Sequence, residues 1–91
     1  MTKIENYLIN KGIRAQYKGF DCLVEAIKLV QKDRTYKNSI TKRLYPDVAK
    51  TLNETASKVE RAIRHAISKS KVLYMTNGEF ISRAALELKA S

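Results

Sequence analysis

The side chains best suited to specific chemistry stand on one face of a predicted helix over residues 55–69. Four of them recur at helical spacing and so share one side of that helix: Ser57, Arg61, Arg64 and Ser68. Glu60 flanks this row. An arginine can donate a forked pair of hydrogen bonds to one guanine edge, and a glutamate can accept a hydrogen bond from a cytosine amino group. The spacing therefore predicts a polar helix face that can read base edges in a DNA groove.

The same residue types allow alternatives that the sequence leaves open. Ser57 and Glu60 have capping-box spacing, so Glu60 could close the start of the helix instead of meeting a base. Arg61 and Arg64 could also form a solvated face, with Glu60 as a local ion-pair partner. His65, the only histidine, fits a phosphate contact or packing at the rim better than catalysis. We expect base contacts from Glu60, Arg61 and Arg64, and contacts to the DNA backbone from Thr55, Ser57, Lys58, His65 and Lys42.

The other side of this helix and the segment before it have the pattern of a helix-turn-helix. Apolar side chains form the back of the second helix: Val59, Ala62, Ile63, Ala66 and Ile67. In the first helix Ala49 is small enough to stand where two helices cross, and Asn53 tolerates the left-handed backbone that the turn needs. Glu54 departs from the pattern, because an apolar residue is common at its position in the turn.

Start signals and apolar spacing predict further helices. Thr2 with Glu5 and Thr76 with Glu79 have capping-box spacing, which places helix starts near both ends of the chain. Apolar residues recur at three and four over residues 19–33 and over residues 39–52. Pro46 has no amide hydrogen to donate, so we expect a break near residue 45 and a short separate helix over residues 46–52, with one kinked helix as the alternative. Around residues 32–37 we expect a basic loop, either a solvated connection or a phosphate contact.

Composition limits the classes of function. The 91 residues carry 18 Lys and Arg against 9 Asp and Glu, a net charge of +9, which favours a polyanionic partner. One cysteine, Cys22, excludes an internal disulfide or a zinc cluster and fits a small buried apolar residue. We see no signal peptide, membrane span, glycine-rich phosphate loop or convincing catalytic pair. We therefore expect an all-α, compact domain of five to six helices, which is cytoplasmic and nucleoid-associated, is not an enzyme and needs no cofactor or metal.

The helix-turn-helix residues also carry a family resemblance. The segment SITKRLYPDVAKTLNETASKVERAIRHAI, together with the upstream KGFDCLVEAIKLV and the terminal TNGEFI, resembles the DNA-binding effector domain of the stage 0 sporulation protein A family of response regulators. The resemblance covers nearly the whole chain. It implies an all-helical domain that reads short guanine-containing promoter boxes in double-stranded DNA, binds tandem boxes as a homodimer and contacts RNA polymerase. It also implies that Glu60, Arg61 and Arg64 lie at the principal DNA-contacting positions.

Two departures from the family qualify what the resemblance implies. Family members carry an N-terminal receiver domain, whereas this chain enters the effector region almost at Met1, so we expect a single effector domain over residues 1–91 without a receiver. The family also has a further helical segment before its last helix, where this chain has only residues 68–75. The main hypothesis is a sequence-specific transcriptional regulator. A truncated antagonist that competes for boxes or forms heterodimers, and a charge-driven RNA or chromatin binder, are the alternatives.

Overall fold

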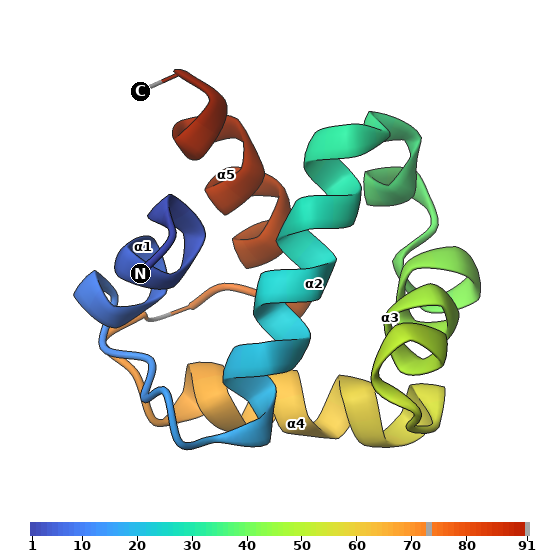
Figure 1. The fold of residues 1–91 in the computed structure, drawn as a ribbon, viewed down its shortest axis with the longest axis horizontal. Helices are drawn as coiled ribbons and strands as arrows, with labels where there is room; N and C mark the ends of the chain where they lie inside the picture. The colour runs from blue at the N-terminus through green and yellow to red at the C-terminus, as the bar shows by residue number, and fades with distance from the viewer. Residues whose placement is uncertain (73, 91) are drawn as a thin grey trace.

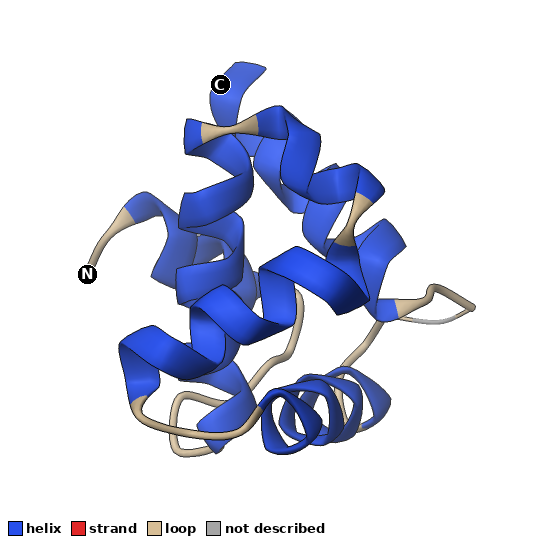
Figure 2. Ribbon diagram, turned by 90° about the vertical axis from the view of Figure 1, so that its right-hand side faces the viewer, coloured by secondary structure: helices blue, strands red, loops and turns tan. Residues whose placement is uncertain are grey.

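The computed structural model describes residues 1–72 and 74–90, and this part of the chain is helical with no strand. In these described ranges the fold consists of five α-helices and two short helical turns connected by loops (Figures 1 and 2). The α-helices are α1 (Lys3–Asn10), α2 (Lys18–Lys32), α3 (Tyr45–Leu52), α4 (Ala56–Ser68) and α5 (Asn77–Ala90). The turns are a 3₁₀ turn, η1 (Arg34–Asn38), and a π-helical turn, η2 (Ile40–Leu44). The expected all-α class and the number of main helices are confirmed.

The first and last helices begin at the two predicted capping boxes. In each box the threonine hydroxyl accepts a hydrogen bond from the glutamate amide, at 3.1 Å, and the glutamate carboxylate accepts one from the threonine amide, at 2.9 Å. These bonds satisfy amides that a helix start leaves without partners, and they lower the pKa of Glu5 and of Glu79. Gly12 follows α1 with φ of +86°, as expected for a residue that ends a helix in the left-handed region.

The centre of the molecule is α2, which has its most extensive contacts with α4 and α5 (Figure 1). Its buried face supplies six of the 21 core residues in the described part of the chain, because its apolar residues recur at helical spacing: Phe20, Cys22, Leu23, Ala26, Ile27 and Val30. Cys22 is fully buried, and this burial raises the pKa of its thiol, so it behaves as the small apolar residue that the sequence predicts. Through these contacts α2 holds α4 and α5 in position relative to each other.

A close approach at Gly19 sets the distance between α2 and α4. A Cβ atom at this position would lie 2.2 Å from the carbonyl oxygen of Ala62 and 2.6 Å from the Cβ atom of Ala66. Both distances are far shorter than van der Waals contact. The missing side chain of Gly19 therefore allows the start of α2 to rest directly on the middle of α4.

The expected short α-helix after Pro46 is confirmed as α3, but the break before it and the basic loop are not found. The chain does not break before Pro46: η2 continues directly into α3, and the amides of Leu44 and Tyr45 donate to carbonyls five residues earlier, on Ser39 and Ile40. A π-helical turn accommodates Pro46 without ending the helix, so the alternative of one distorted helix is closer to the structure. The basic segment is also not an open loop, because the Asp33 carboxylate caps the 3₁₀ turn η1 by accepting from the Thr35 amide at 3.0 Å.

Candidate nucleic-acid interface

The turn between α3 and α4 is consistent with a helix-turn-helix. Asn53 ends α3 in the left-handed region, with φ of 57° and ψ of 49°, as predicted from its residue type. Thr55 then caps α4, and its hydroxyl accepts from the Lys58 amide at 3.2 Å. Because Thr55 takes the capping position, Ser57 lies inside the helix and the alternative Ser57–Glu60 capping box does not form. Glu60 is thus free of a capping role.

The unusual turn residue Glu54 has a structural partner that explains it. Its carboxylate forms an ion pair with the Lys18 ammonium, at the start of α2. The Glu54 side chain is only 15% exposed, so the pair is partly shielded from water. The ion pair thus holds the turn against α2, whereas an apolar contact is common at this position of a helix-turn-helix.

The back of α4 is buried as the sequence predicts. Val59, Ile63, Ala66 and Ile67 lie in the core, and Ala62 packs against it. Apart from Lys42 on η2, the predicted site residues lie at the cap and on the opposite side of this helix. Exposed members of that set are Thr55, Ser57, Lys58, Arg61, Arg64 and His65, while Glu60 is half-buried. The helix therefore has one packed face and one open polar face.

The exposed face of α4 brings the two arginines together at a shallow hollow. Arg61, Arg64, His65 and Ser68 line it. Arg64 forms an ion pair with Glu60 one turn earlier, with 3.6 Å between a guanidinium nitrogen and a carboxylate oxygen, and remains 64% exposed. No ion pair engages Arg61 in the ranges that the structure describes. Arg61 is therefore the more available donor, and Glu60 holds Arg64 as the alternative interpretation anticipates.

His65 packs at the rim of the helix. Its ring meets the Tyr17 ring edge-on, with centroids 5.4 Å apart and an interplanar angle of 63°. The side chain is nevertheless exposed, so packing and a phosphate contact are compatible at this position. Lys42 is not brought into the α4 row: it lies on η2 and is exposed there.

Sequence reasoning missed the part that the start of α5 plays beside α4. The Asn77 side-chain amide donates to the Tyr45 hydroxyl at 3.1 Å and to the backbone carbonyl oxygen of Glu60 at 3.3 Å. Thr76 and Asn77 also line a second hollow together with Glu60 and Arg64. The Thr76–Glu79 capping box indicated where α5 starts, but no sequence signal indicated that this start meets α4. Asn77 thus fixes α3, α4 and α5 relative to one another.

Residues 1–72 and 74–90 contain neither a metal-binding cluster nor a helix that could span a membrane. No group of three or more His, Cys, Asp or Glu side chains there could hold a metal ion. The same ranges contain no helix with the length and apolar character needed to cross a lipid bilayer.

Comparison with known families supports the resemblance found in the sequence. The model of the family described as "Sporulation initiation factor Spo0A C terminal" matches residues 4–85. This match includes all of α2, η1, η2, α3 and α4, and most of α1 and α5. Domains of this family are DNA-binding parts of a sporulation regulator and are not enzymes, which agrees with the expectation from the sequence. The chain therefore belongs to the family of the C-terminal, DNA-binding domain of the sporulation initiation factor Spo0A.

Proposed function

We propose that this chain is a sequence-specific regulator of transcription that binds double-stranded DNA by inserting α4 into the major groove. The observation that carries this proposal is the open face of α4, where Arg61 and Arg64 project on the side opposite a fully packed back. The family match supports a DNA partner, and the net charge of +9 supplies the attraction to phosphates. Specific readout then depends on the side chains of α4.

The dimensions of α4 suit this insertion. Thirteen residues give a helix of about 20 Å, and the major groove is about 12 Å wide, enough for one helix. We assign base contacts to Glu60, Arg61 and Arg64, with Arg61 as the principal guanine ligand because no ion pair occupies it in the described ranges. Backbone contacts are assigned to Thr55, Ser57, Lys58, His65 and Lys42, all of which are exposed.

The Glu60–Arg64 ion pair gives these two residues a joint role. A carboxylate 3.6 Å from the guanidinium holds Arg64 in one region of space before DNA arrives. Exposed pairs of this kind contribute little to stability, typically about 0–1 kcal/mol, so DNA can rearrange the pair at small cost. In the complex Glu60 would accept from a cytosine amino group while Arg64 takes a guanine or a phosphate.

The family resemblance extends the proposal to assembly and location. Each domain measures 28 × 27 × 26 Å, less than one 34 Å turn of B-DNA. Two copies on tandem promoter boxes would therefore fit side by side as a homodimer, and RNA polymerase is the further partner that the resemblance implies. A partner of this kind places the protein at the nucleoid, in the cytoplasm.

A selection of binding sites from random duplexes tests the proposal. Selected duplexes should share a short guanine-containing box, and the chain should prefer that box over a scrambled duplex by about 10³-fold or more at physiological salt. Loss of preference between selected and scrambled duplexes would contradict sequence-specific regulation and favour the charge-driven RNA or chromatin binder.

A second candidate is an antagonist that occupies boxes without activating. The segment between α4 and α5 favours it, because the described residues 69–72 and 74–76 form no helix, whereas the resemblance implies a helical segment there. A reporter gene behind a tandem-box promoter separates the two roles. Activation by this chain alone would eliminate the antagonist, and repression of a full-length regulator on the same promoter would support it.

A further inference from the structure

A second cationic surface lies at the end of the molecule remote from α4. Three cations surround a narrow hollow between the end of α2, the turn η1 and the second half of α5: Arg34, Lys37 and Lys89. Figure 1 shows α4 at one end of the molecule, with η1 and the C-terminal part of α5 at the other. One DNA duplex held by α4 therefore leaves this cationic hollow facing away.

The charges of the cationic hollow are not neutralised by nearby acids. None of its three cations has an ion-pair partner in the described part of the chain. The neighbouring acids are engaged elsewhere: Asp33 bonds to Thr35 and pairs with Arg43 at 3.4 Å, and the Glu87 carboxylate accepts from the Tyr7 hydroxyl. The pKa of Asp33 is lowered by its bonds to Thr35, so it remains a charged carboxylate directed to those partners.

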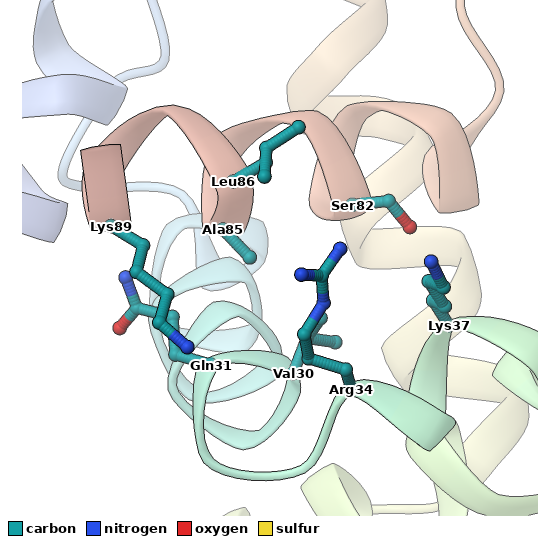
Figure 3. A pocket seen from close by; sticks show the side chains of 8 residues that line it. All are labelled: Val30, Gln31, Arg34, Lys37, Ser82, Ala85, Leu86 and Lys89. Atoms are coloured by element: carbon teal, nitrogen blue, oxygen red, sulfur yellow. The ribbon is translucent and has the colours of Figure 1, made fainter.

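Part of the wall of the cationic hollow is apolar. Val30 and Ala85 line it, and Leu86 lies beside them with 54% of its surface exposed. Figure 3 shows Arg34 and Lys37 reaching from η1 toward the Ser82 hydroxyl on α5, with Lys89 beside Gln31 at the other end of the hollow. Val30 and Ala85 are buried, so the surface combines one exposed apolar side chain, Leu86, with three cations that are unpaired in the described ranges.

We propose that this cationic hollow docks an acidic segment of a partner protein, with one apolar side chain of that segment against Leu86. A protein partner can cover the exposed Leu86 with an apolar side chain of its own, and its acidic side chains can pair with the cations beside it. A DNA backbone would cover Leu86 with phosphates and gain nothing from the apolar wall. A second copy of this chain is disfavoured, because each copy carries a net charge of +9.

Fluorescence anisotropy with a synthetic peptide tests the docking surface. The probe is a fluorescein-labelled peptide of aspartate and glutamate with a central pair of leucines, and its partner probe has serines in place of the leucines. The native chain should bind the leucine peptide several times more tightly than the serine peptide, and Leu86→Ser should remove that difference. The Arg34→Gln/Lys37→Gln double variant should lose about tenfold or more in affinity for the leucine peptide.

A charge-matched control separates local docking from general attraction. Lys3→Gln/Arg14→Gln removes the same net charge at exposed positions that do not line the cationic hollow and form no ion pair in the described ranges, so it should weaken peptide binding much less. Equal losses for the two double variants, or equal binding of the two peptides, would overturn the proposal. So would displacement of the peptide by inorganic phosphate at constant ionic strength, which would indicate a small-anion site. Urea unfolding shows whether each variant folds. If Arg34→Gln/Lys37→Gln loses more affinity for duplex DNA than the control variant does, the surface would belong to DNA binding and the proposal would be overturned.

Discussion

Replacing Gly19 with alanine tests how α2 positions α4. The added Cβ atom would stand 2.2 Å from the Ala62 carbonyl oxygen and 2.6 Å from the Ala66 Cβ atom. The two helices would have to separate by about 1 Å before these atoms reach ordinary contact. Because the nearest obstacle is a backbone carbonyl, no rotation of a side chain can relieve it.

Two opposing effects set the size of the loss. Overpacking a core typically costs about 1–3 kcal/mol, and exchanging glycine for alanine in a helix returns up to about 1 kcal/mol. We place the cost toward the upper end of its range, since the obstacle is backbone, and expect a net loss of about 1–2 kcal/mol in the free energy of unfolding. For a domain of this size that corresponds to a drop in Tm of about 5–15 °C.

Gly78→Ala is the matched control, because Gly19 and Gly78 are each the second residue of an α-helix. At Gly78 the nearest atom to an added Cβ is the Cγ1 atom of Ile40, at 3.3 Å, on a side chain that can move slightly. We expect Gly78→Ala to range from neutral to about 1 kcal/mol more stable. Urea unfolding followed by far-UV circular dichroism measures both variants. Equal effects of the two substitutions would refute the close approach between α2 and α4.

Three further predictions concern stability and DNA binding. The lowered pKa values of Glu5, Asp33 and Glu79 mean that the folded state binds fewer protons than the unfolded state. The stability contributed by these three carboxylates is therefore present above about pH 4.5 and is lost as the pH falls below it. Glu79→Gln should flatten this pH dependence in acid unfolding curves, and an unchanged curve would contradict the capping role of Glu79. Asn77→Ala removes two part-buried hydrogen bonds and should cost about 1–2 kcal/mol in urea unfolding, whereas a loss near zero would show that water replaces them. If about five to seven phosphates are neutralised, log K for DNA should fall against log salt with a slope of roughly −5 to −6 in anisotropy titrations, and a slope near −1 would exclude so many contacts.

Much of the fold follows from local sequence signals. The capping boxes at Thr2 and Thr76 mark where α1 and α5 begin, because a hydroxyl and a carboxylate three residues apart satisfy free amides wherever they occur. Asn53 occupies the left-handed turn for the same local reason. The buried back of α4 follows from apolar periodicity alone. Such features depend on residues that are close to one another along the chain, so they can be predicted directly from the sequence.

Features that depend on distant residues were not predictable in this way. Glu54 departs from the turn pattern because Lys18, far from it in sequence, neutralises its charge. Asn77 meets the Glu60 carbonyl only because α5 returns to α4 in three dimensions. The break that Pro46 predicts is not found, because the π-helical turn η2 runs directly into α3. No sequence rule for proline predicts such a turn. The base-contacting roles of Glu60, Arg61 and Arg64 stay predictions.

The most direct measurement of the central claim is a double-mutant cycle between Arg61 and the guanine of the selected box. Replacing that guanine with 7-deazaguanine removes the N7 acceptor and should cost the native chain on the order of 1 kcal/mol of binding free energy. Arg61→Ala should cost about 1–3 kcal/mol on the box and much less on scrambled DNA. If Arg61 donates to the N7 atom of this guanine, 7-deazaguanine should cause almost no further loss of binding free energy in the Arg61→Ala variant. The same loss from 7-deazaguanine in the native chain and in Arg61→Ala would contradict the Arg61–guanine contact, by which α4 is proposed to read the groove.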